Sequence, residues 1–340
     1  MSRIVSFGEI MLRLNPEGYR RLVQAERLEA SYAGGEANVA VSLANYGHES
    51  VYVTKLPENE LGQSAVNALR RYGVDTSKIV RGGNRIGIYF VEKGASQRAS
   101  KVIYDRAGSS ISEASDKDFD WDHIFEGAQW FHFTGITPAL SEHLPEICLA
   151  ACKEAKRRGI TVSCDLNYRK KLWSEEEACK VMSRIMPYVD VCIANEEDAA
   201  SVFGIHAEKT DIMSGTLSRD GYKKVAKQLT EKFHFRMVAI TLRGSISATD
   251  NQWSGMLYTE NQAYFSKEYS IHIVDRVGGG DSFGGALIHS VISGQKPQEA
   301  IEFAVAASCL KHTIEQDFNL VSEKEVKALM DGNASGRVQR

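Results

Sequence analysis

An α/β fold with a mostly parallel central sheet is predicted by three features of this 340-residue sequence. Short apolar segments of strand character alternate with amphipathic helical segments along most of the chain. Helical segments end at glycines such as Gly47 and Gly73, a common helix stop. The composition, 43% hydrophobic and 25% charged residues, is that of a globular protein able to bury a sizeable core. The repeated β-α-β order favours parallel strands with helices on both faces.

The elements can be placed in order along the chain. A buried strand, a helix, a strand and a helix are predicted for residues 3–10, 34–47, 50–56 and 60–72. The alternation continues through WFHFTGI, a helix ending near Lys156, then ITVSCDLN, VCIAN and RMVAITL with helices between them. An antiparallel excursion is expected in ISATDNQWSGMLYTENQAYFSKEYS, and a last group of helices follows it.

Two segments, residues 13–32 and 84–106, interrupt this alternation. The second contains RIGIYFVEKG and KVIYDR on either side of the polar turn GASQRAS, which predicts a β-hairpin. We expect both segments to form a small β-sheet lid over a ligand crevice at the carboxyl ends of the parallel strands. The main body would comprise 1–12, 33–83 and 107–332, and residues 333–340 would be a flexible tail.

The charge balance and the cysteines exclude several classes of function. A formal net charge of −3 provides no basic field for nucleic acid or an anionic membrane surface. No apolar run reaches 18 residues, and the N-terminal segment lacks the apolar core of a signal peptide. The six cysteines form no CxxC pair, which suits a reducing compartment. We therefore expect a cytoplasmic protein without nucleic-acid or membrane partners.

A cluster of three glycines, Gly278, Gly279 and Gly280, stands directly before Asp281 in VDRVGGGDSFGGALIHSVISG. If it opens a helix, its main-chain N–H groups lie unpaired at the positive end of the helix dipole and can bind a phosphate. Because a carboxylate repels bound phosphate, Asp281 is explained as the base for a hydroxyl that attacks that phosphate. The alternative is that Asp281 is only a helix cap.

Common nucleotide-binding motifs are absent: there is no GxxxxGK[ST], and GGGDSFGG does not fit GxGxxG. The segment DRVGGGDSFGGAL instead resembles the C-terminal signature of ribokinase-like (PfkB-type) carbohydrate kinases, Asp-Thr-x-Gly-Ala-Gly-Asp, with Arg276 and Gly279 where Thr and Ala are commoner. AGGEANVAVSLANYG resembles the sugar-binding Gly-Gly-x-x-x-Asn segment of that family, which gives Gly34, Gly35 and Asn38. The order and spacing of these motifs make the resemblance specific.

Two shorter elements extend the resemblance. NEED resembles the family's Asn-x-x-Glu element, with Asp198 in place of Glu, and TLRGS occupies the usual nucleotide-contacting strand end, with Arg243 where glycine is common. The resemblance implies a ribokinase-like three-layer α/β/α fold that uses ATP and Mg²⁺, and several relatives also use K⁺. Asp198 would act near the magnesium ion, indirectly. The implied ATP contacts are Asn167, Arg169, Asn195, Thr241, Arg243, Gly244, Gly278 and Gly280.

Arginines near the predicted lid bear on the phosphoryl acceptor. YDRAGS places Tyr104 and Arg106 on one face of a strand, and DLNYR offers Asn167 and Arg169 at the end of another. Because arginine binds a carboxylate through two parallel hydrogen bonds, an acidic sugar is a plausible acceptor. The alternatives are that both arginines form surface ion pairs, or that Arg169 lies near phosphates, as in neutral-sugar kinases with a similar Asp-x-Asn-x-Arg segment.

The run GIYFVEKGASQRASKVIYDRAGS is similar to 2-keto-3-deoxygluconate kinases within the family. That resemblance implies transfer of the γ-phosphoryl group of ATP to the hydroxyl at carbon 6, with Asp281 as base and the cluster N–H groups stabilising the transferring phosphoryl. Asp275 would hold a substrate hydroxyl or shape a monovalent-cation loop. The implied substrate-binding residues are Gly34, Gly35, Asn38, Tyr89, Tyr104, Arg106, Arg169, Asp275 and Asp281.

Two other functions remain open at this point. One is a kinase of the same fold that acts on a neutral sugar such as fructose or ribose, and the other is a sugar or nucleotide sensor without catalysis. A sensor has no need for a base beside its phosphate site, so Asp281 favours an enzyme. The exposed edges of the lid strands could pair between subunits, so we expect a homo-oligomer.

Overall fold

A nine-stranded sheet forms the centre of the molecule in the computed structural model, which describes residues 1–195, 197–207 and 218–333. Its strands are β1 (Arg3–Phe7), β4 (Glu49–Val53), β9 (Trp130–Thr134), β10 (Thr161–Asp165), β11 (Val191–Ala194), β12 (Met237–Ser245), β13 (Asp250–Thr259), β14 (Gln262–Phe265) and β15 (Tyr269–His272). They follow the order β14-β13-β12-β11-β10-β9-β1-β4, and β15 pairs with β13. Pairing is parallel from β4 to β12 and antiparallel beyond β12. The predicted mostly parallel sheet and its antiparallel excursion are confirmed.

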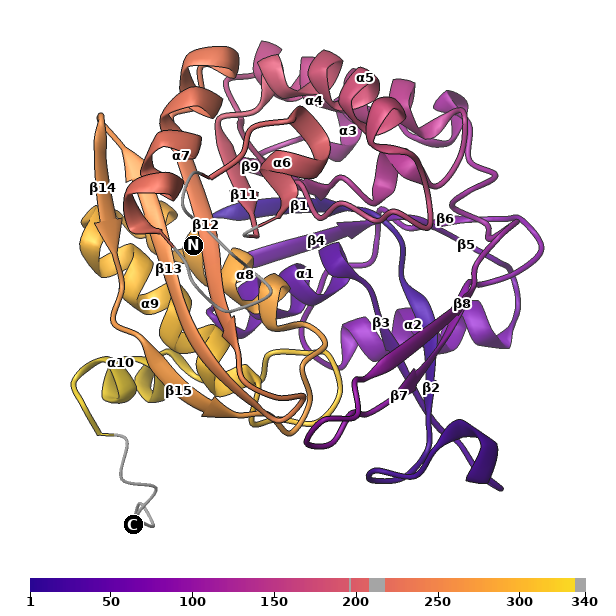
Figure 1. Cartoon of the computed structure of the whole chain (residues 1–340). Coiled ribbons are helices and arrows are strands. Elements are labelled where there is room, and N and C mark those ends of the chain that lie inside the picture. Colours follow the sequence, from indigo (N-terminus) through magenta and orange to yellow (C-terminus); the bar gives the residue numbers. More distant parts are fainter. Residues whose placement is uncertain (196, 208–217, 334–340) are drawn as a thin grey trace.

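Helices cover both faces of this sheet (Figure 1). One layer contains α1 (Gly35–Asn45), α8 (Gly279–Ile292), α9 (Pro297–Lys311) and α10 (Glu323–Met330). The other contains α3 (Trp121–Ile124), α4 (Leu144–Arg157), α5 (Glu175–Ile185), α6 (Asp198–Phe203) and α7 (Arg219–Phe233). The strands supply both cores because successive side chains point to opposite faces: Phe131 and Phe133 pack into one core and Trp130 into the other. This gives the predicted three-layer α/β/α arrangement.

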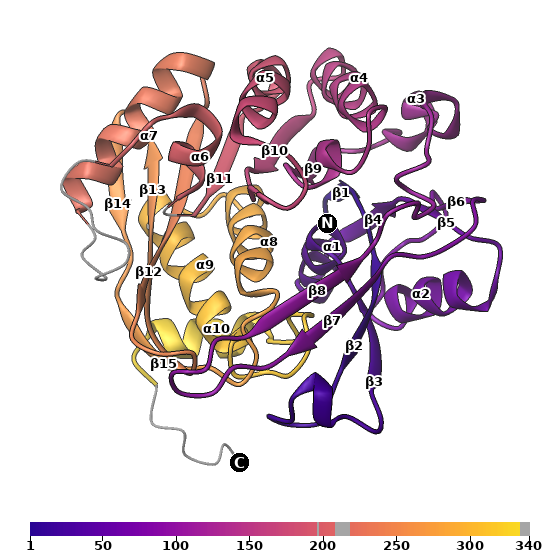
Figure 2. The same cartoon turned by 45° about the vertical axis from the view of Figure 1, so that its right-hand side comes forward.

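A second sheet of four strands, called the lid sheet here, contains β2 (Met11–Asn15), β3 (Glu29–Ala33), β7 (Ile88–Glu92) and β8 (Lys101–Asp105) in the order β3-β2-β7-β8. The predicted hairpin is confirmed, because β7 and β8 pair antiparallel with Tyr89 opposite Tyr104. The sheet is slightly larger than predicted, since it begins at Met11 and β3 ends at Ala33. It lies beside α1 and α2 (Glu60–Arg70) in both views (Figures 1 and 2). The division of the chain into body and lid domains stays a prediction.

The remaining elements are short. The strands β5 (Lys55–Leu56) and β6 (Val80–Arg81) pair with each other, and single 3₁₀ turns are η1 (Leu22–Gln24), η2 (Asp116–Asp118), η3 (Thr137–Ala139) and η4 (Met186–Tyr188). All six cysteines are free thiols. No helix in the described part of the chain combines the length and apolarity needed to cross a membrane. The predicted tail, 333–340, lies outside the described residues except for Asn333.

The parallel strands direct polar residues to one edge of the large sheet. Because β1, β9, β10, β11 and β12 run in the same direction, their carboxyl ends meet at that edge. Glu9 follows β1, Asn167 follows β10 and Asn195 follows β11, while Arg243 lies near the end of β12. The fold therefore gathers several of the predicted site residues from distant parts of the sequence.

Candidate active site

The glycine cluster begins α8, as the sequence predicts. Gly278 is the N-cap, with φ of 83°, and Asp281 lies in the first turn. A side chain at Gly278 would be strained at this φ, and its Cβ would overlap the main-chain carbonyl of Asp317. Gly280 is exposed and has open space at its Cα. The first turn of the helix therefore presents main-chain N–H groups that have no partners within the helix.

Asp281 lies between two cavities. The larger, of ≈ 520 Å³, is called the phosphate-side cavity here because the first turn of α8 lines it. The smaller, of ≈ 80 Å³, is called the lid-side cavity because the lid sheet forms one of its walls. Asp281, Asn167, Arg169 and Tyr104 line both of them. A group bound on one side and a group bound on the other would thus meet at the Asp281 carboxylate.

The phosphate-side cavity contains almost all of the residues predicted to contact ATP. Asn167, Arg169, Asn195, Thr241, Arg243, Gly278 and Gly280 line it, together with Gly279. Gly244 is the exception: it lies in β12 opposite Gln252 and does not line the cavity. Arg276 is an addition, and burial together with the nearby Arg243 lowers its pKa. Two arginines that repel each other are a favourable environment for a polyphosphate.

The lid-side cavity contains the residues predicted for the sugar, apart from Asp275. Gly34, Gly35, Asn38, Tyr89, Tyr104, Arg106, Arg169 and Asp281 line it. The rings of Tyr89 and Tyr104 stack with centroids 6.1 Å apart, and the Arg106 guanidinium lies 5.2 Å from the Tyr104 ring centroid. Arg106 is fixed by Glu9, whose Oε2 accepts hydrogen bonds from its Nε at 2.8 Å and from its Nη2. The cavity wall is therefore aromatic and polar, with one guanidinium held in place.

The prediction that Asp275 holds a substrate hydroxyl does not fit the structure, because its carboxylate lines neither of the two cavities and is 2% exposed. The Arg13 guanidinium binds Asp275 through Nη2 at 2.6 Å and binds Asp317 through Nη1. Asp317 also accepts a hydrogen bond of 2.9 Å from the Tyr89 hydroxyl. Burial of so many charges is tolerated because each is paired and hydrogen-bonded. Asp275 thus joins the body to the lid sheet.

The electrostatics of Asp281 suit a base. Burial raises the pKa of this carboxyl group to about 7, and the hydrogen bond from Asn38 Nδ2 to its Oδ2, at 2.6 Å, opposes that increase. The negative charges of Asp317 and Glu36 contribute to this increase in pKa, whereas Arg169 opposes it. A base is most effective when its pKa lies near the working pH. A carboxyl group with this pKa exchanges its proton near neutral pH.

Asp165 and Asp198 are the carboxylates that could attract a divalent cation. Both line the phosphate-side cavity, and Asp198 accepts hydrogen bonds from the main-chain N–H groups of Tyr168 at 3.0 Å and Asn195 at 2.8 Å. Burial and repulsion from Asp198 raise the pKa of Asp165 well above its usual range. Within the described ranges, no three His, Cys, Asp or Glu side chains converge as a metal site. Carboxylate oxygens are the ligands that Mg²⁺ takes from proteins, and its other ligands at this pair would be phosphate and water.

Several residues of the site were not predicted. Glu9 and Asp165 each follow or end a parallel strand, which is the same signal that drew attention to Asn167. Glu36 is buried within the predicted glycine segment, and its Oε1 accepts hydrogen bonds from the hydroxyls of Thr134 at 2.7 Å and Thr137 at 2.6 Å. Asp317 lies in a loop after α9, where no local pattern marks it.

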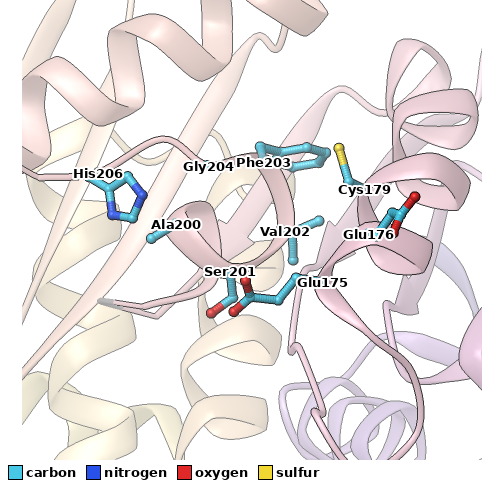
Figure 3. A pocket seen from close by; sticks show the side chains of 9 residues that line it. All are labelled: Glu175, Glu176, Cys179, Ala200, Ser201, Val202, Phe203, Gly204 and His206. Atoms are coloured by element: carbon cyan, nitrogen blue, oxygen red, sulfur yellow. The ribbon is translucent and has the colours of Figure 1, made fainter.

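A separate surface hollow of ≈ 480 Å³ lies between α5 and α6 (Figure 3). The figure labels Glu175, Glu176 and Cys179 from α5 and Ser201 and Phe203 from α6 around it. None of the residues predicted for the site lines this hollow. Ser201 lines both this hollow and the phosphate-side cavity, but Asp281 does not line the hollow.

Known proteins resemble the chain over nearly its whole length. A 2-dehydro-3-deoxygalactonokinase of Haloferax volcanii is 33% identical over 335 residues, which cover 98% of this chain and 98% of the relative. The crystal structure of a 2-dehydro-3-deoxygluconokinase from Thermotoga maritima is 55% identical, with a TM-score of 0.95 and coverage of 98% of this chain and 100% of that one. A provisionally assigned ribokinase II from E. coli, solved with ATP and Mg²⁺, is 18% identical with a TM-score of 0.82, covers 98% and 100%, and shows likeness of fold alone.

The family assignment rests on more than these pairwise similarities. Residues 1–317 match the family described as pfkB family carbohydrate kinases. The match includes the Gly34–Asn38 segment, the hairpin of the lid sheet and the GGGD cluster at the start of α8. The ribokinase-like fold is confirmed by the same similarities. The chain belongs to the PfkB family of carbohydrate kinases.

Proposed function

We propose that this kinase transfers the γ-phosphoryl group of ATP to the 6-hydroxyl of 2-keto-3-deoxygluconate, also called 2-dehydro-3-deoxygluconate, giving 2-keto-3-deoxy-6-phosphogluconate. The observation that carries this proposal is the position of Asp281, which lines both cavities at the first turn of α8. A sugar hydroxyl in the lid-side cavity and a phosphate in the phosphate-side cavity would meet at this carboxylate. The names of the similar proteins from Thermotoga maritima and Haloferax volcanii support a 2-keto-3-deoxy sugar acid as the acceptor.

The reaction follows from the groups at this boundary. Asp281 accepts the proton of the 6-hydroxyl while that oxygen bonds to the γ-phosphorus, and the bond from phosphorus to the β–γ bridging oxygen breaks to release ADP. The main-chain N–H groups at the start of α8 stabilise charge on the transferring group, where one such donor contributes about 2.7–4 kcal/mol. Magnesium, when bound near Asp165 and Asp198, neutralises the charge of the phosphates.

The choice of an acidic acceptor rests on the cations of the lid-side cavity. Arg106 and Arg169 both line it, and Arg169 has a hydrogen bond of 3.1 Å from Nη1 to the main-chain carbonyl of Tyr168. A guanidinium has five N–H donors, so Arg106 retains donors for a sugar carboxylate in addition to those that bind Glu9. A neutral sugar would leave these cations without a partner from the ligand, so we assign the acidic sugar to this site.

The test is a comparison of phosphoryl acceptors with Mg²⁺ and ATP. The panel contains 2-keto-3-deoxygluconate, 2-keto-3-deoxygalactonate, gluconate, fructose and ribose, with ADP release as the rate and ³¹P NMR to locate the new phosphate. We expect the highest kcat/KM for 2-keto-3-deoxygluconate and phosphate on carbon 6. A preference for the galactonate epimer would correct the stereochemistry, a preference for fructose or ribose would replace the substrate class, and no turnover with any of them would refute the kinase proposal.

The setting of the reaction follows from general features of the chain. We propose a cytoplasmic location, because ATP is available there and the six cysteines are free thiols. The homo-oligomer expected from the edge of the lid sheet stays a prediction, and β8 is its exposed outer strand. Gel filtration with light scattering would measure it.

A further inference from the structure

A fully buried lysine lies behind the glycine cluster. Lys311 is the last residue of α9 and is 0% exposed. Its Nζ donates hydrogen bonds to the main-chain carbonyl oxygens of Asp275 at 3.3 Å, Ile314 at 3.3 Å and Gln316 at 2.5 Å. Burial lowers the pKa of Lys311, and Asp275 and Asp317 oppose that change. Three carbonyl acceptors need three N–H donors, so this geometry is that of the charged ammonium, because a neutral amine has only two.

The segments that Lys311 joins are those on which the start of α8 rests. His312, the next residue, accepts main-chain hydrogen bonds from Val274 at 2.8 Å and Asp275 at 3.2 Å through its carbonyl. Gln316 donates its main-chain N–H to the Asp275 carboxylate at 3.2 Å. These bonds tie residues 312–316 to the segment that leads into the glycine cluster.

The glycine cluster packs directly on the same loop. A Cβ at Gly278 would overlap the main-chain carbonyl of Asp317, and a Cβ at Gly279 would overlap the ring of His312. The backbone of the cluster therefore has no space between itself and residues 312–317. A displacement of this loop would displace the N–H groups that face the phosphate-side cavity.

One of the two roles that the family resemblance implies for Asp275 is to shape a monovalent-cation loop, and such a loop would lie at this place. The residues present do not fit such an ion. Main-chain carbonyls are typical ligands of alkali cations, but those of Asp275, Ile314 and Gln316 already accept hydrogen bonds from Lys311. The Asp275 carboxylate is paired with Arg13. A second cation beside the ammonium would be repelled by it.

We propose that the ammonium group of Lys311 is a built-in replacement for a monovalent cation, and that it positions the start of α8 so that this kinase turns over without K⁺. Lys311 is a positioning residue, because it lines neither cavity at Asp281. Its effect on turnover rests on the proposed kinase function, whereas its effect on the stability of the loop does not. The two can therefore be tested separately.

The first test uses the unaltered chain. Turnover and the midpoint of thermal unfolding, Tm, are measured in tetramethylammonium buffer and again after replacement by K⁺ at the same ionic strength. We expect both quantities to be unchanged by K⁺. A clear stimulation of kcat or an increase in Tm specific to K⁺ would overturn the proposal, because it would mean that a cation site remains open. The Tm comparison is informative even if the assigned sugar is wrong.

The second test removes the ammonium. In K⁺-free buffer we expect Lys311→Ala to lower kcat at least about tenfold, since displacing one N–H donor of this kind has an effect of that size or larger. Added K⁺ or NH₄⁺ should restore much of the lost kcat and raise the Tm, because the shortened side chain frees the carbonyls and the space. Lys311→Met fills the space without charge and should show no rescue. Lys324→Ala, on the exposed face of α10, is the control and should behave as the unaltered chain.

Two results of the second test would contradict the proposal. One is a Lys311→Ala variant that keeps full kcat without K⁺, and the other is a loss that neither K⁺ nor NH₄⁺ reverses in kcat or in Tm. If Lys311→Ala does not fold in K⁺-free buffer, recovery of folding on addition of K⁺, followed by circular dichroism, is the equivalent supporting result. A variant that stays unfolded with both ions counts against the proposal.

Discussion

The site has two ends: the α8 end, at the phosphate-side cavity, and the lid end, at the lid-side cavity. These two ends are constructed differently. At the α8 end, the reactive groups are neighbours in sequence, since Gly278, Gly280 and Asp281 all belong to one helix start. The surrounding contacts come from the body of the protein: the Ser308 hydroxyl donates to the Gly279 carbonyl at 2.7 Å. Such groups have fixed positions before any ligand arrives, which favours stabilisation of a transition state.

At the lid end, each side chain depends on a partner far away in the sequence. The Tyr89 hydroxyl is held by Asp317, and the Arg106 guanidinium is held by Glu9. The strand β8, which carries the exposed Tyr104 and leads directly into Arg106, is at the edge of the lid sheet. Groups on an edge strand can change position when a ligand binds more easily than groups at a buried helix start. The comparison suggests that chemistry resides at the α8 end and selection of the sugar at the lid end.

The largest expected effect comes from removing the base. Asp281→Asn keeps the size of the side chain but cannot accept the hydroxyl proton, so kcat should fall by about 10²–10⁴-fold. The KM for ATP should change little, because the helix start and its N–H groups remain. Steady-state kinetics with both substrates measures this. Asp220→Asn, which changes an exposed acid in the first turn of α7, is the matched control. Unchanged turnover in Asp281→Asn would remove the chemical role from the α8 end.

A smaller effect, and of a different kind, is expected at the lid end. Arg106→Ala should raise the KM for the sugar acid roughly 10–150-fold, corresponding to a charge-assisted hydrogen bond of roughly 1.5–3 kcal/mol. The KM for ATP should stay within a small factor of the original value. Arg85→Ala removes another arginine next to the lid sheet, one that pairs with Asp105 and lines neither cavity, and serves as the control. Equal increases in both KM values would show that Arg106 acts on phosphate instead.

The two ends differ in how much of their structure could be predicted from the sequence, because local patterns can be recognised in a sequence and pairing between distant residues cannot. A helix start with three glycines and an acid is a local pattern, so the place of Asp281 could be inferred from adjacent residues, while its role as a base stays a prediction. The alternation of strands and helices is local as well, and it predicted the sheet and its direction correctly. The register and the first and last residues of a strand depend on its pairing with neighbouring strands. This explains why β2 and β3 extend past the predicted 13–32 segment.

Pairs between distant charges could not be predicted in the same way. Asp275 stands six residues before Asp281, and its motif suggested a ligand contact, yet Arg13 neutralises it from the lid sheet. Nothing local connects residues 13 and 275, and only the folded chain brings them together. Lys311 is similar, because a lysine at the end of a helix is ordinarily exposed, and its burial depends on the carbonyls of a loop that follows.

The pH dependence of the reaction in the unaltered chain separates the two ends most cleanly. The base must be unprotonated to act, and burial raises the pKa of Asp281 to about 7, so activity should be lost as the pH falls through about 7. Below that value kcat/KM should decrease about tenfold per pH unit, whereas an ordinary aspartate would keep its activity to near pH 4. The measurement is kcat/KM for the sugar acid from about pH 5 to pH 9.

The Asn38 hydrogen bond sharpens this prediction. It favours the charged form of Asp281, so Asn38→Ala should move the midpoint of the profile to higher pH. Arginines stay charged throughout this range, so Arg106→Ala should change the height of the profile and leave its midpoint in place. A flat profile between about pH 5 and pH 9 would mean that Asp281 is not the titrating base, while a shifted midpoint in Arg106→Ala would mean that the lid end takes part in the proton transfer.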